Sequence, residues 1–160
     1  MEAILFRGKD LKTKEWCFGG YYHSPLWRGV EDDRHYILPT RDVYYEDLAV
    51  IEVDPETVGQ YVCREDINRK KIFTGDIVKT YSRGMYLSDK LLVVVSDDCF
   101  TEDGLGRVWP QDTIYVEVVG NVYDNPELVG KKYADLYKHY FCFGTSVTRD
   151  DLKRNNMEAK

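Results

Sequence analysis

The chain is organised around residues 53–79, which read VDPETVGQYVCREDINRKKIFTGDIVK. Pro55 fixes its own φ and keeps the residue before it out of the helical region, which indicates a turn. The β-branched and aromatic residues within 57–64 then predict a strand, and a polar loop follows. Gly75 and the aspartate after it mark a second turn, and residues 77–81 predict the next strand. The segment therefore predicts two strands and two turns.

Upstream of that segment, residues 3–23 predict a β-hairpin. Three large aromatic side chains of its second strand share one face at period two: Trp16, Phe18 and Tyr22. Gly19 and Gly20 in the same strand indicate a bulge or a close approach of another backbone. Residues 35–38 and 48–53 are further strand candidates.

Downstream, residues 90–96 form a continuous apolar run. The run is too short for a typical helix and is rich in β-branched residues, so we expect it to be the most buried strand. Residues 97–106 are acidic and contain glycine, which predicts a loop. Residues 114–123 alternate as a half-buried strand does, and Gly120 interrupts the row of side chains, which indicates a bend.

The end of the chain predicts short helical segments. Asn125 suits an N-cap and Pro126 suits the first helical turn, so a helix is predicted to begin there. Two lengths stay open: a single turn, or a helix that continues towards residue 140. The tyrosines and the leucine within residues 133–140 follow helical spacing.

Composition describes a folded, acidic chain. Its 160 residues are 43% hydrophobic and 14% aromatic, which excludes wholesale disorder, and its net charge is −6. The densest basic cluster, residues 69–71, is flanked by acidic residues and is expected to be a solvated loop. The charge therefore disfavours nucleic acid as a partner. We expect most of the 13 tyrosines to pack in sheets, with a binding surface as the alternative.

Neither the cysteines nor the histidines show ligand spacing. Cys17, Cys63, Cys99 and Cys142 contain no Cys-x-x-Cys pair, so free thiols in a reducing cytoplasm are expected. We expect Cys63 to be a small core residue. His23, His35 and His139 lie far apart in the sequence, which disfavours a metal site, and no apolar run has the length of a membrane span.

Motifs of catalysis are missing from the sequence. There is no Gly-x-Ser-x-Gly, no phosphate-binding Gly-x-x-x-x-Gly-Lys and no His-Glu-x-x-His. The adjacent carboxylates at 32–33 and 97–98 are interpreted as solvated turns. Asp76 is expected to cap its own turn, and the alternative is a role at the mouth of a barrel. Gln60 and Asn121 are interpreted as structural amides. We therefore predict no catalytic residue, no cofactor and no metal.

Several segments resemble the YopX-like family of phage and prophage proteins, in the family's order. They are Ile4-Leu5-Phe6-Arg7-Gly8 with Trp16, residues 57–61, Asp66, residues 72–78 and residues 119–128. The family-motif residues are interpreted as structural, namely Gly59, Gln60, Tyr61, Asp66, Gly75, Asp76, Gly120, Asn121, Asn125 and Pro126. Where the family tends to have a tight Asn-Gly turn, this chain has Asn68-Arg69, which leaves the type of turn open.

The resemblance implies a mainly β protein from a mobile element, located in the cytoplasm of a bacterial host and without a known catalytic residue. It implies an N-terminal β hairpin or meander at residues 1–56, followed by a small SH3-like barrel at residues 57–130. Residues 131–160 lie beyond the resemblance and are predicted to be a partly helical extension.

Three classes of function stay open. The first is a non-catalytic module that binds a protein partner or assembles with itself, since small β folds offer loops and sheet edges for docking. The second is a nucleic-acid-associated accessory protein, because exposed aromatic rings can stack on bases. The third is an enzyme whose site is assembled from dispersed residues. We favour the first class.

Overall fold

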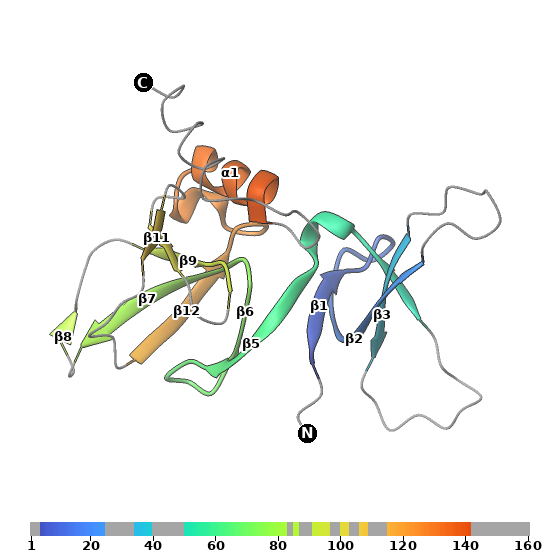
Figure 1. The fold of residues 1–160 in the computed structure, drawn as a ribbon, viewed down its shortest axis with the longest axis horizontal. Coiled ribbons are helices and arrows are strands. Elements are labelled where there is room, and N and C mark those ends of the chain that lie inside the picture. Colours follow the sequence, from blue (N-terminus) through green and yellow to red (C-terminus); the bar gives the residue numbers. More distant parts are fainter. Residues whose placement is uncertain are drawn as a thin grey trace. The chain divides into compact units, whose positions relative to one another are not determined.

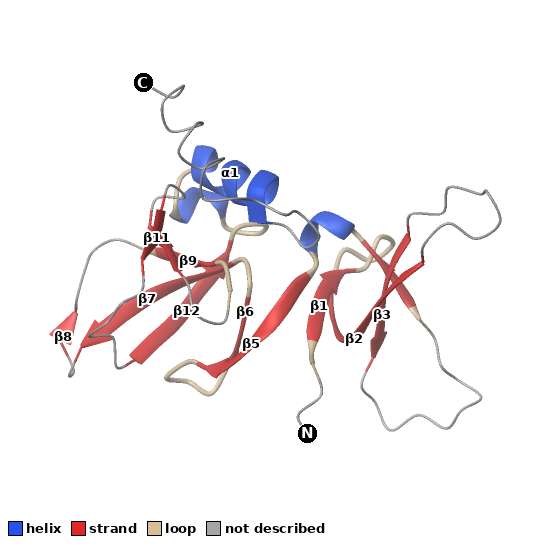
Figure 2. Ribbon diagram, in the orientation of Figure 1, coloured by secondary structure: helices blue, strands red, loops and turns tan. Residues whose placement is uncertain are grey.

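The computed structural model describes residues 4–24, 34–39, 50–82, 85–86, 91–96, 100–102, 106–108 and 115–141 (Figure 1). The chain divides into two compact units, Met1–Tyr61 and Val62–Lys160. Strands make up most of the described elements, and the helices are short (Figure 2). The prediction of a mainly β protein is therefore confirmed.

The first unit is an antiparallel sheet in the order β4-β3-β2-β1-β5. Its elements are β1 (Phe6–Lys9), β2 (Trp16–Ser24), β3 (Arg34–Pro39), β4 (Ile51–Val53), a 3-10 turn (Pro55–Thr57) and β5 (Gly59–Glu65), which continues into the second unit. The strand predicted from residue 57 thus begins at Gly59. The reason is local, because the Asp54 side chain and carbonyl accept hydrogen bonds from the N–H groups of Glu56 and Thr57 and close a turn first.

The sheet of the first unit curls so that β4 approaches the residues just after β1. Asp10, just after β1, forms a β-bridge with Val53 of β4. The backbone N–H of Leu11 donates to Glu52 O at 3.1 Å, which adds to the same edge. Gly8 permits this approach, because a Cβ there would lie 3.0 Å from the Val53 side chain. The edge of β4 is therefore covered in part by the chain itself.

One face of this sheet forms the core of the first unit. Ile37, Val53 and Val58 are buried there, and Phe6, Cys17, Tyr21 and Ile51 pack against them. The close approach predicted at the Gly19-Gly20 pair is present at Gly19, where a Cβ would lie 1.8 Å from Leu38 O. At Gly20 nothing lies within 4 Å of such an atom.

The second unit holds the remaining elements. They are β6 (Lys71–Phe73), β7 (Asp76–Ser82), β8 (Met85–Tyr86), β9 (Leu92–Val94), β10 (Phe100–Glu102), β11 (Gly106–Val108), β12 (Tyr115–Asn121), a 3-10 turn (Pro126–Leu128) and α1 (Lys131–Phe141). Its sheet has the order β11-β10-β9-β7-β12, β8 pairs with β7, and β6 pairs with the end of β5. The register of β12 against β7 shifts between Val118 and Gly120, which places a bulge where a bend was predicted.

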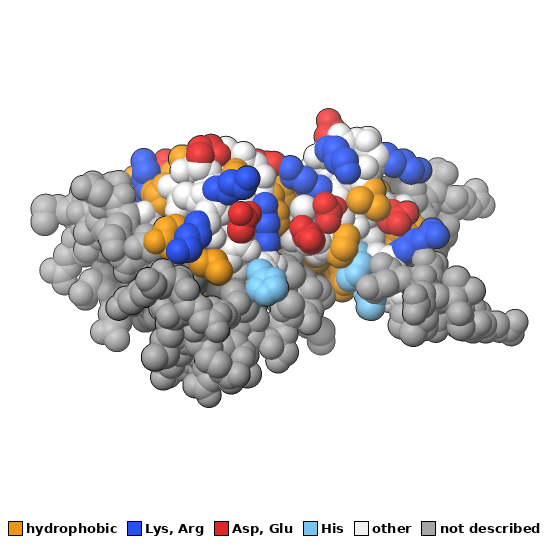
Figure 3. All heavy atoms as spheres, turned by 90° about the horizontal axis from the view of Figure 1, so that it is seen from above, with side chains coloured by type: hydrophobic (Ala, Val, Ile, Leu, Met, Phe, Trp, Pro, Cys, Tyr) orange, Lys and Arg blue, Asp and Glu red, His pale blue; other side chains and the backbone are white. Residues whose placement is uncertain are grey.

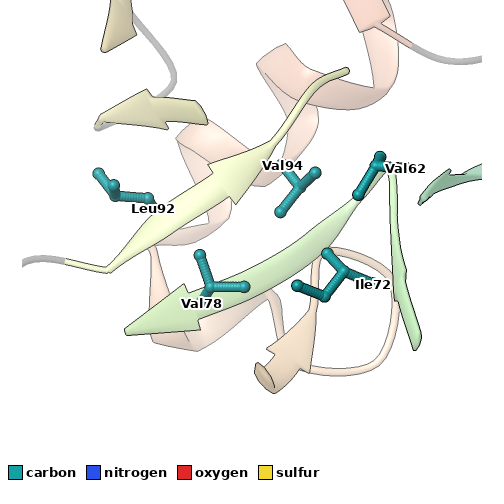
Figure 4. Packing of buried hydrophobic residues seen from close by; sticks show 5 residues of the cluster. All are labelled: Val62, Ile72, Val78, Leu92 and Val94. Carbon is teal, nitrogen blue, oxygen red and sulfur yellow. The ribbon is translucent and has the colours of Figure 1, made fainter. Parts of the chain in front are cut away.

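Two cores lie on opposite faces of the second sheet. On one face Val62 and Ile72, from β5 and β6, pack against Val78, Leu92 and Val94 (Figure 4). On the other face Ala134 and Tyr137 of α1 pack against Ile77, Val93 and Val122. All three residues of β9 are buried, because one layer covers each of its faces. Among the strands whose burial is described at every residue, β9 is the one with all residues buried, which agrees with the prediction for residues 90–96.

Two predictions in the second unit are wrong, and a third is right only in part. Residues 97–106 were expected to be a loop, but β10 lies within them, held by pairing with β9 on one side and β11 on the other. Cys63 was expected in the core, but it is exposed and lies in the left-handed region at φ 55°, which interrupts the regular alternation of β5 after the buried Val62. Asn125 is the N-cap residue, as predicted, but its side chain makes no capping hydrogen bond, because its Oδ1 accepts the N–H of Asn121 at 3.4 Å instead.

The helical segments divide at Gly130. Of the two lengths left open for the helix at Pro126, the structure has the single turn, and Gly130, at φ +86°, separates it from α1. Residues 142–160 lie outside the described residues, as do the carboxylates at 32–33 and 97–98. Among the described residues no sheet closes into a barrel, so the SH3-like barrel stays a prediction. Within the same residues, no helix has the length and apolar character needed to cross a bilayer.

Candidate functional site

The family-motif residues near residue 121 form a self-contained turn. Asn121 Oδ1 accepts hydrogen bonds from the N–H groups of Tyr123 and Asp124, at 3.0 and 2.9 Å, and its Nδ2 donates to Asp124 Oδ2 at 2.9 Å. A Cβ on Gly120 would lie 2.7 Å from Asn125 Oδ1, so this asparagine packs where only glycine fits. The amide and carboxylate groups of this turn are therefore occupied in shaping the backbone.

Gly75 and Asp76 close the turn between β6 and β7. Gly75 lies at φ +85°, its N–H donates to Val94 O and its carbonyl accepts from Val122 N. It thus joins β9 to the chain just after β12. Asp76 is buried, and its Oδ2 accepts the N–H of Phe73 at 2.8 Å. The carboxylate lies in the turn, in the way that the capping interpretation expected.

Asp66 fixes the loop between β5 and β6 onto β12. Its Oδ1 accepts the N–H groups of Asn68 and Lys70, at 2.8 and 2.9 Å, and its Oδ2 accepts Val118 N at 3.1 Å. Burial acts to raise the pKa of Asp66, but these three donors outweigh it and hold the pKa below its usual value. Ile67 N also donates to Val116 O, so the loop covers part of the β12 edge.

The structure brings together only part of the predicted set. Asp76 pairs with Asn121 across β7 and β12, and Asp66 bonds the same strand further along. Gly59, Gln60 and Tyr61 lie instead on β5, where Gln60 is exposed and pairs with Phe6 of β1. In the described residues no three His, Cys, Asp or Glu side chains gather where they could hold a metal ion.

Two histidines that are distant in sequence meet in the first unit. His23 of β2 and His35 of β3 are register partners, and their rings stack at 4.5 Å between centroids. The Tyr21 hydroxyl lies 2.5 Å from His35 Nδ1. The sequence separation of the histidines was therefore a poor guide to their distance. The spacing of the two histidines along the chain does not predict that β2 pairs with β3 in this register.

The opposite face of the same sheet carries exposed aromatic rings. Strand register places Trp16, Phe18 and Tyr22 of β2 on this face, with Tyr36 of β3 beside them. Phe18 and Tyr22 keep 45% and 57% of their surface exposed. The rings of Tyr22 and Tyr36 lie 6.3 Å apart between centroids. We call these four residues the aromatic face. The sequence showed the period-two row on β2, but not that it would be left exposed.

Cations border the aromatic face at both ends. Lys9 Nζ lies 5.3 Å from the centre of the Trp16 ring, and Arg7 Cζ lies 4.7 Å from it. At the other end Arg34 pairs with Ser24 at the end of β2. Arg34 Nε is 3.9 Å from Glu52 Oε1, and the two side chains are 54% and 36% exposed, so solvent screens this ion pair and it is weak.

A cleft of about 410 Å³ adjoins the aromatic face. It is lined by residues 10–12, by Arg34 and Tyr36 of β3, and by residues 50–52. Both signs of charge meet there, since Asp10 and Glu52 line the cleft together with Lys12 and Arg34. Mixed charge also marks the wider surface, because on the side seen in Figure 3 basic and acidic side chains are interspersed. The cleft thus offers hydrogen-bond donors and acceptors beside an aromatic ring.

These features define a mainly β protein in which Asp66, Asp76 and Asn121 accept hydrogen bonds from backbone N–H groups and in which Phe18 and Tyr22 are exposed. Residues 5–130 match the family model of the YopX protein, which covers most of the chain. The chain belongs to the YopX family. No curated protein matches it.

Proposed function

We propose that this protein is a non-catalytic interaction module, and that the aromatic face is its binding surface. The observation that carries the proposal is the exposure of Phe18 and Tyr22 beside Tyr36 on a sheet whose other face already holds the core. The cross-strand pair of Tyr22 and Tyr36 stabilises the sheet, but 45% of the Phe18 surface and 57% of the Tyr22 surface stay exposed. Exposed aromatic clusters are enriched where proteins bind partners. The location we propose with it is the cytoplasm of a bacterial host, and the origin a phage or prophage.

Face binding is better supported than edge pairing. Asp10 and Leu11 bond the outer edge of β4, and the Asp66–Ile67 loop bonds the edge of β12. A strand whose N–H and C=O groups already have partners is a poor template for adding another strand. A partner therefore gains more from the aromatic face than from either of these edges.

The geometry gives less support to catalysis. Asp66, Asp76 and Asn121 direct their side-chain oxygens at backbone N–H groups within their own turns or the adjacent strand. A general base has to reach a proton of its substrate, and a carboxylate held by backbone donors is poorly placed for that. These groups stabilise turns and register instead.

The test uses the full chain as bait in a bacterial lysate, with captured protein and captured nucleic acid both quantified. We compare the wild type with the double variant Phe18→Leu and Tyr22→Leu, and with Tyr115→Leu as a control, because Tyr115 is 53% exposed on β12. Loss of the captured material in the double variant alone supports the proposal. Equal capture by all three proteins would overturn it.

A further inference from the structure

We infer that the aromatic face binds single-stranded nucleic acid, with bases stacked on Tyr22 and Phe18 and phosphates near Lys9 and Arg34. The inference rests on the proposed function and names the partner of the same surface. The juxtaposition that carries it is two exposed rings on one strand, Phe18 and Tyr22, with a cation near each end of that strand. Single-strand binders combine these two elements, aromatic platforms and positive charge along the backbone path.

The spacing along β2 suits separate stacking events. Residues that are two apart on one face of a strand are about 7 Å apart, so Phe18 and Tyr22 are separated by about 13 Å. Gly20 lies between them without a side chain and with nothing within 4 Å of a Cβ position. This leaves room for a base against each ring. Base stacking tolerates any sequence, because every base has a π face.

Charge distinguishes nucleic acid from a second copy of the chain. If two aromatic faces met through a two-fold axis with their β2 strands antiparallel, the Lys9 end of one copy would lie at the Arg34 end of the other. Two cations would then approach each other, and Glu52, whose Oε1 is 3.9 Å from Arg34 Nε, would offset only part of that charge. A phosphate group is instead attracted to both cations, because each can form a charge-assisted hydrogen bond with it.

Charge also distinguishes a single strand from a duplex. A duplex binder needs a broad basic surface, whereas this chain has a net charge of −6 and acidic side chains interspersed with basic ones in Figure 3. Rings on a sheet cannot stack on bases that are already paired and stacked with each other. Unpaired bases are the form in which nucleic acid can use this face.

The cleft beside Tyr36 provides for the edge of one base. Its volume of about 410 Å³ is within the range of small-molecule sites. The cationic Arg34 and Lys12 can donate hydrogen bonds, and the carboxylates of Asp10 and Glu52 can accept them. The cleft can therefore hold the polar edge of a base next to the phosphate that Arg34 contacts.

The experiment measures fluorescence anisotropy of a labelled, mixed-sequence oligodeoxynucleotide of about 12 nucleotides, a length that small β folds occupy. A single-stranded RNA and a DNA duplex of the same length are measured in the same way. All measurements use the full-length protein chain. Tyr22→Leu keeps an apolar side chain and removes the π face, so we expect the dissociation constant to rise about 5- to 150-fold. Tyr115→Leu should leave it unchanged, and near-UV circular dichroism checks that both variants are folded.

Salt dependence tests the role of the cations. Replacing Arg34 by Gln should bring the slope of log K against log salt closer to zero by about 0.7, which is the release expected for one phosphate contact on a single strand. Lys9→Gln should do the same. An unchanged slope in both variants, or duplex binding tighter than single-strand binding, would overturn the inference.

The outcomes separate this inference from the proposal on which it rests. If no oligonucleotide binds at low salt, but capture from a lysate still depends on Phe18 and Tyr22, the partner is a protein and only the nucleic-acid inference fails. If capture does not depend on those rings either, both proposals fail.

Discussion

The sheets of the two units differ in what covers their faces. In the second unit β5 and β6 cover one face of β9 and α1 covers the other, so Leu92, Val93 and Val94 are all buried. In the first unit β2 turns Tyr21 towards the core and leaves Tyr22 57% exposed on the outer face. Apolar content therefore does not decide which strand is buried. The presence of a second covering layer decides it.

The largest effect we expect comes from the same substitution at a covered and an exposed tyrosine. Tyr137 is 2% exposed and packs on Ile77 and Val93, so Tyr137→Ala should lower the free energy of unfolding by about 3–5 kcal/mol. Tyr22→Ala loses mainly the contact with Tyr36 and should cost about 1 kcal/mol or less. Urea unfolding measures both. Equal losses would mean that the two tyrosines are equally covered in solution.

A smaller difference in stability is expected between glycine-to-alanine substitutions at one position in each unit. Gly75 lies at φ +85°, and a Cβ there would lie 3.0 Å from Tyr123 Cε2, so Gly75→Ala should cost about 1–3 kcal/mol. Gly20 has a Cβ position with nothing within 4 Å, so Gly20→Ala should change stability by about 0.5 kcal/mol or less. Thermal unfolding compares the two variants. A large loss at Gly20 would contradict an open outer face.

Local patterns predicted elements better than pairings. The period-two row of Trp16, Phe18 and Tyr22 and the apolar run at residues 90–96 were both visible in the sequence, since alternation and continuity are properties of neighbours along the chain. The contact of His23 with His35 depends on the register of β2 against β3, which a pattern within one strand does not specify.

The candidate site was only half visible for the same reason. Trp16, Phe18 and Tyr22 could be placed on one face, but the face could point inwards or outwards. Tyr36 and Arg34 joined them only through strand pairing. For the family-motif residues the limits of prediction were reversed: the residues were recognised, but their contacts were not. Their segments were matched in sequence, while their hydrogen bonds, such as Asp66 to Val118, span up to 52 residues and needed the fold.

The next prediction concerns how the stabilisation by Asp66 depends on pH. Because its pKa is lowered in the folded state, its stabilisation is fully present above the unfolded value of about 3.9 and is lost as pH falls through the folded value. Asp66→Asn should therefore cost about 1–3 kcal/mol near pH 7. The difference from the wild type should shrink at a pH below the folded value. Urea unfolding at several pH values measures it, and a constant difference would contradict this role.

The exposed neighbour of Asp66 supplies a matched control for that experiment. Glu65→Gln removes the same charge one residue earlier, at the exposed end of β5. It should change the free energy of unfolding by about 0.5 kcal/mol or less near pH 7. A loss as large as that of Asp66→Asn would mean that net charge is the cause, rather than the hydrogen bonds to Val118 and the loop.

The smallest expected changes in the free energy of unfolding concern a backbone feature that both units have. Each has a tight loop that begins with an aspartate and contains a non-glycine residue in the left-handed region, Lys14 at φ 62° in the first unit and Arg69 at φ 62° in the second. A side chain costs about 1–2 kcal/mol there, and glycine adds some entropy to the unfolded chain. Lys14→Gly and Arg69→Gly should therefore each raise the free energy of unfolding by about 0.5–1 kcal/mol.

Arg64 provides the control for the arginine, because it lies in β5 without a positive φ. Arg64→Gly should lower the free energy of unfolding by about 0.5–1 kcal/mol, since glycine weakens a strand interior. Opposite signs at residues 64 and 69, measured by urea unfolding, would show that backbone conformation decides the result. Destabilisation by Arg69→Gly would instead mean that its side chain contributes more than its conformation costs. The loop would then owe its shape to contacts of Arg69 as well as to Asp66.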